Sequence, residues 1–353
     1  MFSFFNSSQS PKVVLTRNLG PDVMPFLERR QDIDLVVWGQ DRTCDRKWLL
    51  ENVQGARALI VILTDSVDQE VLDAAGPQLQ VVSTMSVGYD HINVKELAKR
   101  NIKLGYTPDV LTDAVADTSI MLALMAGRNA RESMTVVNEG KWPEYSWGPF
   151  LFAGRQLSAS SSSPVRTAGF LGFGRIAQAT LTRLIPFGFT HCLYTSSPSS
   201  TPTPERDAAI QEAHGLQALR RVDLDTLAAE SDIVFVLAPG GAATANLVDE
   251  HFLRKMKKTS VLVNTSRGTL VDSHALAKAL RERWIWGAGL DVVTGEPQIT
   301  ADHPLVKEPR CIILPHIGSA TVETRIDMAT LAVKNALAVI SGTEMLASLE
   351  LSS

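Results

Sequence analysis

The sequence has few cysteines, little net charge and no long apolar run. Its 353 residues include only three cysteines, Cys44, Cys192 and Cys311, with no CxxC pair and no even set for a disulfide framework. The net charge of −4 provides no basic stripe for nucleic acid, and no apolar run reaches the roughly 18 residues of a membrane helix. We therefore expect no nucleic-acid partner, no membrane partner and a cytoplasmic location.

Short apolar runs separated by helical stretches organise most of the chain. Because 353 residues exceed the roughly 250–300 at which a single core stops growing, we expect two domains. Strands alternating with helices from about residue 12 to 107, and again from 168 to 314, predict an α/β protein with two doubly wound, Rossmann-like parallel-sheet domains. The strand candidates are Val13–Leu15, Leu35–Val37, Ala58–Leu63, Val81–Ser83, Ala168–Leu171, Ile233–Leu237, Val261–Val263 and Cys311–Leu314.

Two longer helices are predicted outside these series. Val110 to Asn129 has little polar face in its second half, which indicates a mostly buried helix linking the domains. Thr321 to Ile340 should pack one apolar face on a core, although periodicity does not say which domain provides that core. The serine-rich residues 158–164 indicate a solvated loop.

A glycine-rich loop follows the strand candidate Ala168–Leu171 and opens a helical pattern. Gly172 allows a tight turn, and Gly174 lets backbone N–H groups approach a pyrophosphate at a helix N-terminus. Ala177 replaces the usual last glycine. The strand-turn-helix context favours a dinucleotide site over a glycine-rich turn without a ligand.

The residues about twenty positions beyond this loop bear on the choice of cofactor. An NAD-specific site would carry an acid there, whereas this chain has Tyr194 followed by the hydroxyl residues Thr195, Ser196 and Ser197. Hydroxyls can bond a 2′-phosphate that a carboxylate would repel, so NADPH is expected to be preferred, with NADH possible. The arginine expected beside a 2′-phosphate is missing, and Arg206 is the first one downstream.

A cation, a carboxylate and an imidazole follow in the order Arg267, Glu296 and His316. Each comes after a strand-like run, at the carboxyl edge where open α/β sheets bind ligands. Arginine suits a substrate carboxylate, and histidine can donate a proton to a new alkoxide. Singly, such residues are often structural or solvated; together, behind a dinucleotide loop, they favour hydride transfer to a 2-oxo acid. No metal site is expected.

Six segments together resemble the D-isomer-specific 2-hydroxyacid dehydrogenases, and the similarity covers nearly the whole chain. Within that family the chain is most similar to the glyoxylate/hydroxypyruvate reductases, through residues 83–88, 313–321 and the acid-free Tyr194-Thr195 turn. The six segments are residues 83–92, 172–176, 266–268, 289–292, 295–297 and 315–321.

The resemblance implies a function and a set of catalytic residues. The expected reaction is NAD(P)H-dependent reduction of glyoxylate to glycolate and of hydroxypyruvate to D-glycerate. Arg267 would bind the substrate carboxylate, His316 would be the general acid/base and Glu296 its partner, while backbone N–H groups of Val87 and Gly88 would also meet the carboxylate. A larger 2-oxo acid is the nearest alternative, and a dinucleotide-sensing corepressor or scaffold is another.

The resemblance also implies a division of the chain. Residues 1–107 with 321–353 would bind substrate, residues 108–320 would bind the dinucleotide, and the active site would lie in the cleft between them. Asp291 would bond the nicotinamide carboxamide, Thr265 would lie against the cofactor and Ser319 near the substrate. The full expected cofactor set is Gly172, Gly174, Arg175, Ile176, Thr195, Ser196, Ser197, Pro239, Thr265, Arg267, Asp291, His316 and Gly318.

Two aromatic or imidazole side chains stand apart from this set. Trp147 resembles an aromatic that enters a partner subunit's active site in relatives, although a core or surface tryptophan is an equal alternative. A homodimer is expected in either case. His91 resembles a residue at a helix entry, with Asp90 as a cap, and is left outside the expected site.

Overall fold

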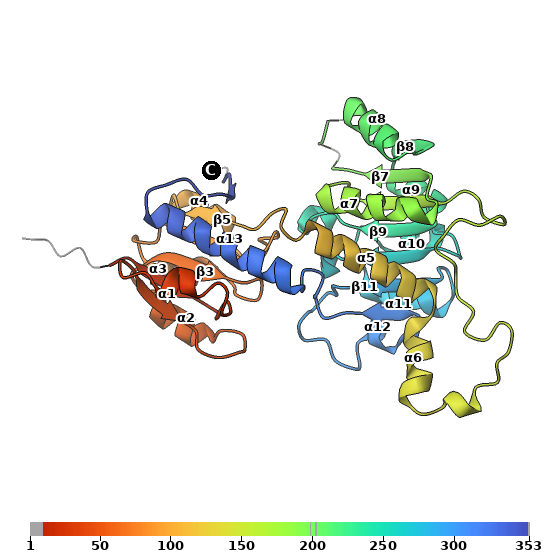
Figure 1. Ribbon diagram of the computed structural model, residues 1–353, viewed down its shortest axis with the longest axis horizontal. Helices are drawn as coiled ribbons and strands as arrows, with labels where there is room; N and C mark the ends of the chain where they lie inside the picture. The colour runs from red at the N-terminus through yellow and green to blue at the C-terminus, as the bar shows by residue number, and fades with distance from the viewer. Residues whose placement is uncertain (1–9, 198, 202, 352–353) are drawn as a thin grey trace, which may run out of the picture. The chain divides into compact units, whose positions relative to one another are not determined.

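The computed structural model describes residues 10–197, 199–201 and 203–351. These residues form two compact units. The first contains the chain up to Leu111 and again from Ala320 onward, and the second contains Thr112–Ser319. Each unit is one sheet with helices on its faces (Figure 1).

The first unit is built on a six-stranded sheet in the order β13-β5-β4-β3-β1-β2. All neighbours are parallel except β13, which pairs antiparallel with β5. The order is a doubly wound one, with its switch point between β1 and β3. The strands are β1 Lys12–Leu15, β2 Asp34–Val37, β3 Ala56–Val61, β4 Val81–Thr84, β5 Lys103–Gly105 and β13 Ser348–Leu349. The helices are α1 Pro25–Glu28, α2 Arg46–Asn52, α3 Gln69–Ala75, α4 Val94–Lys99 and α13 Val322–Ile340.

The last helix, α13, belongs to the first unit. Its periodicity alone did not show which domain provides the core on which it packs. The helix packs against β3, β4 and β5. A Cβ on Gly105 of β5 would lie 2.8 Å from Cβ of Asn335, so helix and strand approach closely because this position is glycine. Thr321 caps the helix by accepting from the N–H of Thr324.

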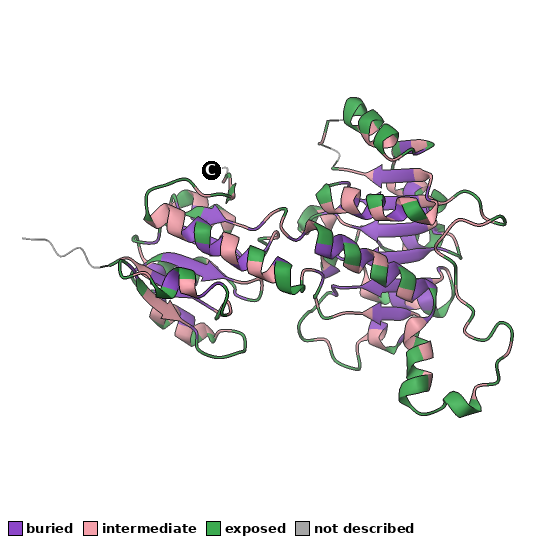
Figure 2. Cartoon of the chain, in the orientation of Figure 1, coloured by how far each residue is buried: buried purple, intermediate pink, exposed green. Residues whose placement is uncertain are grey.

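The second unit has a seven-stranded, wholly parallel sheet in the order β12-β11-β10-β9-β6-β7-β8. Strand order reverses between β6 and β9, and doubly wound sheets bind dinucleotides at that switch point. Figure 2 shows its central strands buried. The strands are β6 Thr167–Leu171, β7 His191–Thr195, β8 Ala218–Arg221, β9 Ile233–Val236, β10 Val261–Asn264, β11 Gly287–Leu290 and β12 Cys311–Ile313.

Eight α-helices and four short 3₁₀ segments belong to the described part of the second unit. The α-helices are α5 Thr112–Gly127, α6 Ala130–Asn138, α7 Arg175–Leu184, α8 Pro204–Ala213, α9 Leu224–Glu230, α10 Glu250–Lys255, α11 Ser273–Arg281 and α12 Pro304–Lys307. The 3₁₀ segments are η1 Trp142–Glu144, η2 Ile185–Phe187, η3 Ala242–Thr244 and η4 Gly268–Leu270.

Helix α5 is the mostly buried helix that the sequence predicts. Leu122 is fully buried, and a Cβ on Gly289 of β11 would lie 2.8 Å from the Leu122 Cβ. The helix therefore lies directly on the sheet. Among the described residues, none of the helices is long and apolar enough to cross a membrane.

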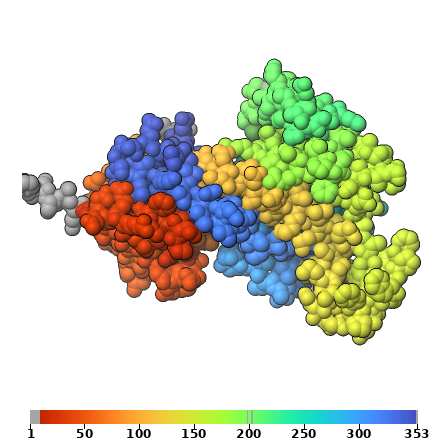
Figure 3. All heavy atoms as spheres, viewed as in Figure 1, coloured from red at the N-terminus to blue at the C-terminus, as the bar shows by residue number. Residues whose placement is uncertain are grey.

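Helix α6 and the chain that follows it stand out from the body of the second unit (Figures 1 and 3). We call residues 130–152 the protruding arm. It was not predicted from the sequence, because its apolar side chains do not face a core. Those at least 40% exposed are Met134, Val137, Trp142, Trp147, Phe150 and Leu151.

Candidate functional site

The candidate site lies along the carboxyl edge of the second sheet. Gly172 follows β6, Pro239 follows β9, Arg267 follows β10, Asp291 follows β11 and His316 follows β12. Because neighbouring parallel strands end at the same edge, the predicted cofactor and catalytic residues of this unit are brought to one side of the sheet.

The glycine-rich loop has the geometry of a phosphate cradle. Gly172 has φ +90°, and a Cβ there would lie 2.7 Å from Cα of Ala238, so only glycine fits. Gly174 is the N-cap of the ten-residue helix α7, and a Cβ there would meet nothing within 4 Å. The start of this helix is therefore uncrowded beside Gly174, as the approach of a dinucleotide pyrophosphate requires.

A pocket of about 310 Å³ lies beside this loop. It collects five of the predicted cofactor residues, from β6, β7 and β9, and adds polar groups from the segment that follows β7. The pocket is lined by Gly172, Phe173, Gly174, Tyr194, Ser196, Ser197, Ser200, Thr201, Thr203, Arg206, Arg221, Leu237 and Pro239. Of the remaining predictions for this region, Thr195, Arg175 and Ile176 are not among the lining residues.

Two arginines line this pocket, so the prediction that its arginine is missing is wrong. Arg206 on α8 donates to Asp207 and, at 3.1 Å, to the hydroxyl of Tyr194. Arg221, at the end of β8, donates to the carbonyl oxygens of Ser197 at 3.0 Å and Ser200 at 2.9 Å. The parallel pairing of β7 with β8 brings Arg221 beside the serines despite a separation of more than twenty residues.

His316 and Glu296 form a hydrogen-bonded pair. Nδ1 of His316 lies 2.9 Å from Oε1 of Glu296, and both side chains are about one-third exposed. The other carboxylate oxygen of Glu296 accepts from the N–H of Val293 at 3.3 Å, which fixes the carboxylate against its own turn. Nδ1 of the imidazole is therefore occupied, and Nε2 is the ring nitrogen left for a substrate.

Asp291 fixes the backbone of the loop that carries His316 through three hydrogen bonds. Its two carboxylate oxygens accept from the N–H groups of Ile317 at 2.8 Å and Gly318 at 2.7 Å, and its carbonyl accepts from His316 N–H at 2.9 Å. His316 itself has φ +56°, an unfavourable conformation that these bonds stabilise. Burial raises the pKa of Asp291, while the two backbone donors oppose that shift. Its first role is thus to position the histidine loop.

The turn that carries Arg267 lies against the segment that leads to Glu296. A Cβ on Gly268 would lie 2.2 Å from the carbonyl carbon of Val293, so these two turns touch through backbone. The Arg267 guanidinium donates to the carbonyl of Ser266 at 2.8 Å, and Asn264 Nδ2 bonds the Arg267 carbonyl at 2.8 Å. Through these contacts the turns bearing Arg267, Glu296 and His316 form one cluster.

The remaining predicted residues of this unit border the cluster. Thr265 Oγ1 lies 2.8 Å from Oγ of Ser119 on α5, and the Gly318 carbonyl accepts from Thr118 of the same helix at 3.3 Å. Ser319 is half-buried and is the last residue of the unit. The buried helix α5 therefore contacts the candidate site at both Thr265 and Gly318.

Val87 and Gly88 belong to the first unit, where they follow β4. Ser86 Oγ donates to the carbonyl of Gly88 at 2.6 Å and closes a tight turn around Val87. Asp90 does not cap the next helix as the sequence suggested, because Asn93 accepts from the N–H of Glu96 at the start of α4. The turn is thus positioned independently of the helix cap.

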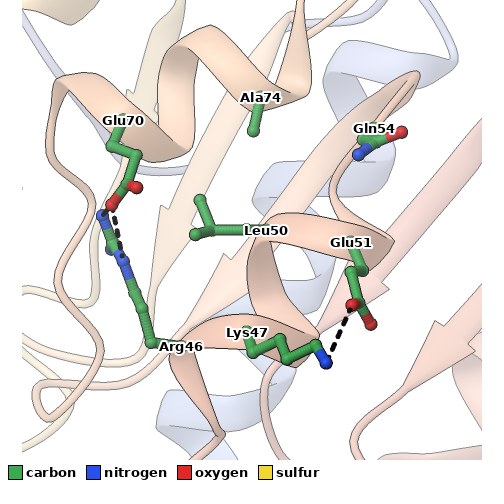
Figure 4. Close-up of a pocket in the computed structure, with 7 residues that line it drawn as sticks. All are labelled: Arg46, Lys47, Leu50, Glu51, Gln54, Glu70 and Ala74. Atoms are coloured by element: carbon green, nitrogen blue, oxygen red, sulfur yellow. Dashed lines mark hydrogen bonds and ion pairs between the residues drawn. The ribbon is translucent and has the colours of Figure 1, made fainter.

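The first unit also has a shallow groove between α2 and α3, drawn in Figure 4. Leu50 and Ala74 provide its apolar surface. Arg46 pairs with Glu70 at 2.6 Å and Lys47 lies 3.9 Å from Glu51, so its charges compensate one another. Nothing in this arrangement selects an anionic substrate, and the groove is not part of the candidate site.

The chain is similar to known proteins over most of its length. Residues 120–318 match the family model described as "D-isomer specific 2-hydroxyacid dehydrogenase, NAD binding domain". The glyoxylate reductase/hydroxypyruvate reductase of Homo sapiens is 41% identical over 340 residues, 96% of this chain and 98% of that protein.

Two solved structures cover the chain almost completely. A protein of Thermus thermophilus has a TM-score of 0.82 and 36% identity, over 96% of this chain and all of that one. An NADPH-dependent glyoxylate/hydroxypyruvate reductase of Sinorhizobium meliloti, in complex with NADP and malonate, has a TM-score of 0.79 and 30% identity, over 96% and 97%. The chain belongs to the D-isomer specific 2-hydroxyacid dehydrogenase family.

Proposed function

We propose that the chain catalyses the NAD(P)H-dependent reduction of small 2-oxo acids, glyoxylate to glycolate and hydroxypyruvate to D-glycerate. The observation that carries this proposal is the His316–Glu296 hydrogen bond, in contact through backbone with the turn of Arg267. The names of the human and Sinorhizobium meliloti relatives support the substrate class.

The chain's residues have distinct tasks in this reaction. The guanidinium of Arg267 binds the substrate carboxylate and polarises the carbonyl. When bound, the dinucleotide supplies a hydride to the carbonyl carbon. As that C–H bond forms, the carbonyl π pair moves to oxygen, which takes a proton from Nε2 of His316 and becomes the hydroxyl. Glu296 keeps the imidazole oriented through Nδ1 at 2.9 Å, which leaves Nε2 for the transfer.

The two units divide the work in this proposal. The second unit holds the dinucleotide on the loop at Gly172 and Gly174 and in the pocket at Ser196 and Ser197. The first unit is the substrate-binding unit, and backbone N–H groups of Val87 and Gly88 donate to the substrate carboxylate. Backbone donors suit this role because they add no charge that would have to be desolvated.

The test is the loss of nicotinamide absorbance when purified protein meets glyoxylate, hydroxypyruvate, pyruvate or a branched 2-oxo acid. Each acid is offered with NADPH and with NADH. Fast turnover of the first two supports the proposal. Turnover of only the larger acids would replace the substrate class while keeping the mechanism. Tight dinucleotide binding with no turnover of any acid would favour a sensing or scaffolding role.

His316→Ala tests the assigned proton donor. We expect kcat to fall by about 10²–10⁴-fold, the usual contribution of a general acid, while dinucleotide binding is retained. His274→Ala is the matched control, because His274 is exposed at the start of α11, outside the site. Unchanged turnover in the His316 variant would contradict the assignment.

We infer that NADPH is preferred over NADH. The pocket beside the glycine-rich loop has serine hydroxyls but no acid among its lining residues, and it includes two guanidinium groups. The hydrogen bonds from Arg221 go to carbonyl oxygens, so they do not neutralise its positive charge. A 2′-phosphate would therefore find both donors and net positive charge there. A dissociation constant for NADPH at least as large as that for NADH would contradict this preference.

We also propose that two copies of the chain associate through the protruding arm. Phe150 is 87% exposed and Trp147 is 74% exposed, which is a large apolar surface for an isolated chain. Trp147 packs edge-on against Tyr145, with the two ring centroids 5.1 Å apart. The exposed aromatic side chains are therefore ordered against one another. A second copy would bury them.

Analytical ultracentrifugation tests this association. The chain mass is 38.4 kDa, and we expect a species of twice that mass. Combined Trp147→Ala and Phe150→Ser changes should shift it toward monomer, whereas Phe26→Ser, which alters an exposed phenylalanine of α1, should not. A monomeric wild type would exclude the proposal.

We propose a cytoplasmic location. Cys44, Cys192 and Cys311 are all free thiols, and a reducing compartment keeps thiols in that state. Fractionation of cells that make the protein, followed by detection in the cytosolic fraction, tests this; recovery from a secreted fraction would contradict it.

A further inference from the structure

Three side chains of the first unit form a continuous hydrogen-bonded chain at the end of β4. His91 Nε2 lies 3.0 Å from Oγ1 of Thr84, which lies 2.7 Å from Oγ of Ser86. Ser86 Oγ in turn lies 2.6 Å from the carbonyl oxygen of Gly88. Thr84 is fully buried and Ser86 is 6% exposed, so water does not substitute freely for these contacts.

Counting protons determines which group donates and which accepts in each of these three hydrogen bonds. A hydroxyl has one proton, and that of Ser86 is donated to the Gly88 carbonyl, which can only accept. Ser86 therefore accepts from Thr84, whose single proton is then used. Thr84 must accept from His91, so the histidine carries its proton on Nε2.

The backbone of His91 is anchored to the segment that follows a different strand. The carbonyl of His91 accepts from the N–H of Val67 at 2.9 Å, and the Val67 carbonyl accepts from Asn93 N–H at 2.9 Å. Val67 lies in the segment that follows β3, whereas the turn at Gly88 follows β4. His91 therefore links two segments that follow neighbouring strands. Its backbone bonds the segment after β3, and its imidazole contacts Thr84, which is connected through Ser86 to the turn after β4.

We propose that His91 is a positioning residue that acts through Thr84 and Ser86 to hold the Val87–Gly88 turn for the substrate carboxylate. This inference rests on the proposed function, since it assigns that carboxylate to the turn. His91 takes no part in proton transfer to the substrate. Its effect is on how well the resting turn is organised, which governs substrate affinity rather than the chemical step.

A set of four variants tests this assignment by kinetics. His91→Leu and Ser86→Ala should each raise KM for glyoxylate by roughly five- to tenfold, the effect of about one net hydrogen bond, with kcat within about twofold of wild type. The double variant should be no worse than either single one, because both break the same chain. His91→Gln, which keeps an Nε2 donor, should restore most of the affinity.

Several results would overturn the inference. An unchanged KM in His91→Leu, a kcat loss larger than the KM change, or multiplying effects in the double variant would each do so. Thermal melts check that the variants fold. If His91→Leu does not fold, the KM of Ser86→Ala decides the outcome.

A second measurement does not depend on turnover. Nitrogen-15 NMR of the His91 ring in the resting protein should show a proton on Nε2, and a neutral ring protonated on Nδ1 would overturn the hydrogen-bond direction. An Nε2–H signal in a protein that reduces no 2-oxo acid would refute the proposed function while leaving the hydrogen-bonded chain intact. The two failures are therefore distinguishable.

Discussion

The two units of the chain are both doubly wound sheets, but their carboxyl edges present different chemistry. The second unit gathers a guanidinium, a carboxylate and an imidazole along neighbouring strand ends. The first unit presents hydroxyl groups and backbone at the end of β4 and keeps one carboxylate, Asp65, almost fully buried. In the proposed function, one architecture thus serves reaction chemistry in one unit and substrate binding in the other.

The largest effect should come from removing charge in the second unit. We expect Arg267→Gln to lower kcat/KM by about 10³-fold, because a neutral amide neither pairs with the substrate carboxylate nor stabilises developing alkoxide charge. Arg267→Lys should recover only part of the loss, since lysine lacks the planar fork. Steady-state kinetics with glyoxylate measures both. If the glutamine variant matched wild type, the chemical role of this edge would be mistaken.

The first unit should respond in KM rather than in kcat. Gly88→Ala places a methyl group where backbone is proposed to approach the substrate, so we expect KM to rise by roughly 10²-fold with kcat within about threefold. Kinetics over a range of glyoxylate concentrations separates the two constants. A selective loss of kcat would mean that the first unit takes part in the chemical step.

The region of the proposed cofactor pocket offers a matched pair of neighbouring arginines. Arg221→Ala should weaken NADPH binding by roughly tenfold and leave NADH binding unchanged, since about 1.4 kcal/mol is lost with one charge-assisted contact. Arg220→Ala is the control, because Arg220 pairs instead with Glu230 at 2.5 Å. Fluorescence titration gives both dissociation constants. Equal weakening of NADPH and NADH would place the 2′-phosphate elsewhere.

The smallest effect concerns the stability of the first unit. Burial raises the pKa of Asp65 above its ordinary value of 3.8, with hydrogen bonds from Thr16 and Ile62 N–H opposing the shift. The folded state therefore binds this proton more tightly than the unfolded state does. Relative to Asp65→Asn, wild type should be most stable below pH 3.8 and lose that advantage as pH rises through the raised value.

Urea unfolding of both proteins at a series of pH values measures this difference. We expect the advantage of wild type to shrink as pH rises and then to remain constant toward neutral pH. A difference that increased with pH would mean that Asp65 is stabilised as the anion, contrary to the effect of its burial.

The sequence predicted those parts of the fold and site that depend on local patterns. Apolar runs marked β6, β9 and β10, because central parallel strands are buried on both faces. The edge strand β12 was also marked, since its residues Cys311 and Ile312 are buried. Strand β8 was not predicted, since Ala218–Arg221 is half polar and lies at a sheet edge. Without β8, the place of Arg221 beside the serines could not be inferred.

Two features of the site depend on long-range pairing and escaped prediction for that reason. The hydrogen bonds between Asp291 and the loop of His316 join residues more than twenty positions apart. No sequence-spacing rule predicts such contacts. The position of Gly268 against Val293 likewise follows from adjacent strands β10 and β11. The motifs supplied the candidate residues, while the sheet order determined which of them touch.

The packing of α13 on β3, β4 and β5 has a consequence for synthesis on the ribosome. The first unit needs this helix, yet roughly 200 residues of the second unit are made between its two segments. At about 5–20 residues per second, the nascent first segment waits on the order of 10–40 s for its missing helix. The second unit is continuous in sequence and can fold first, so the unit begun earliest is completed last.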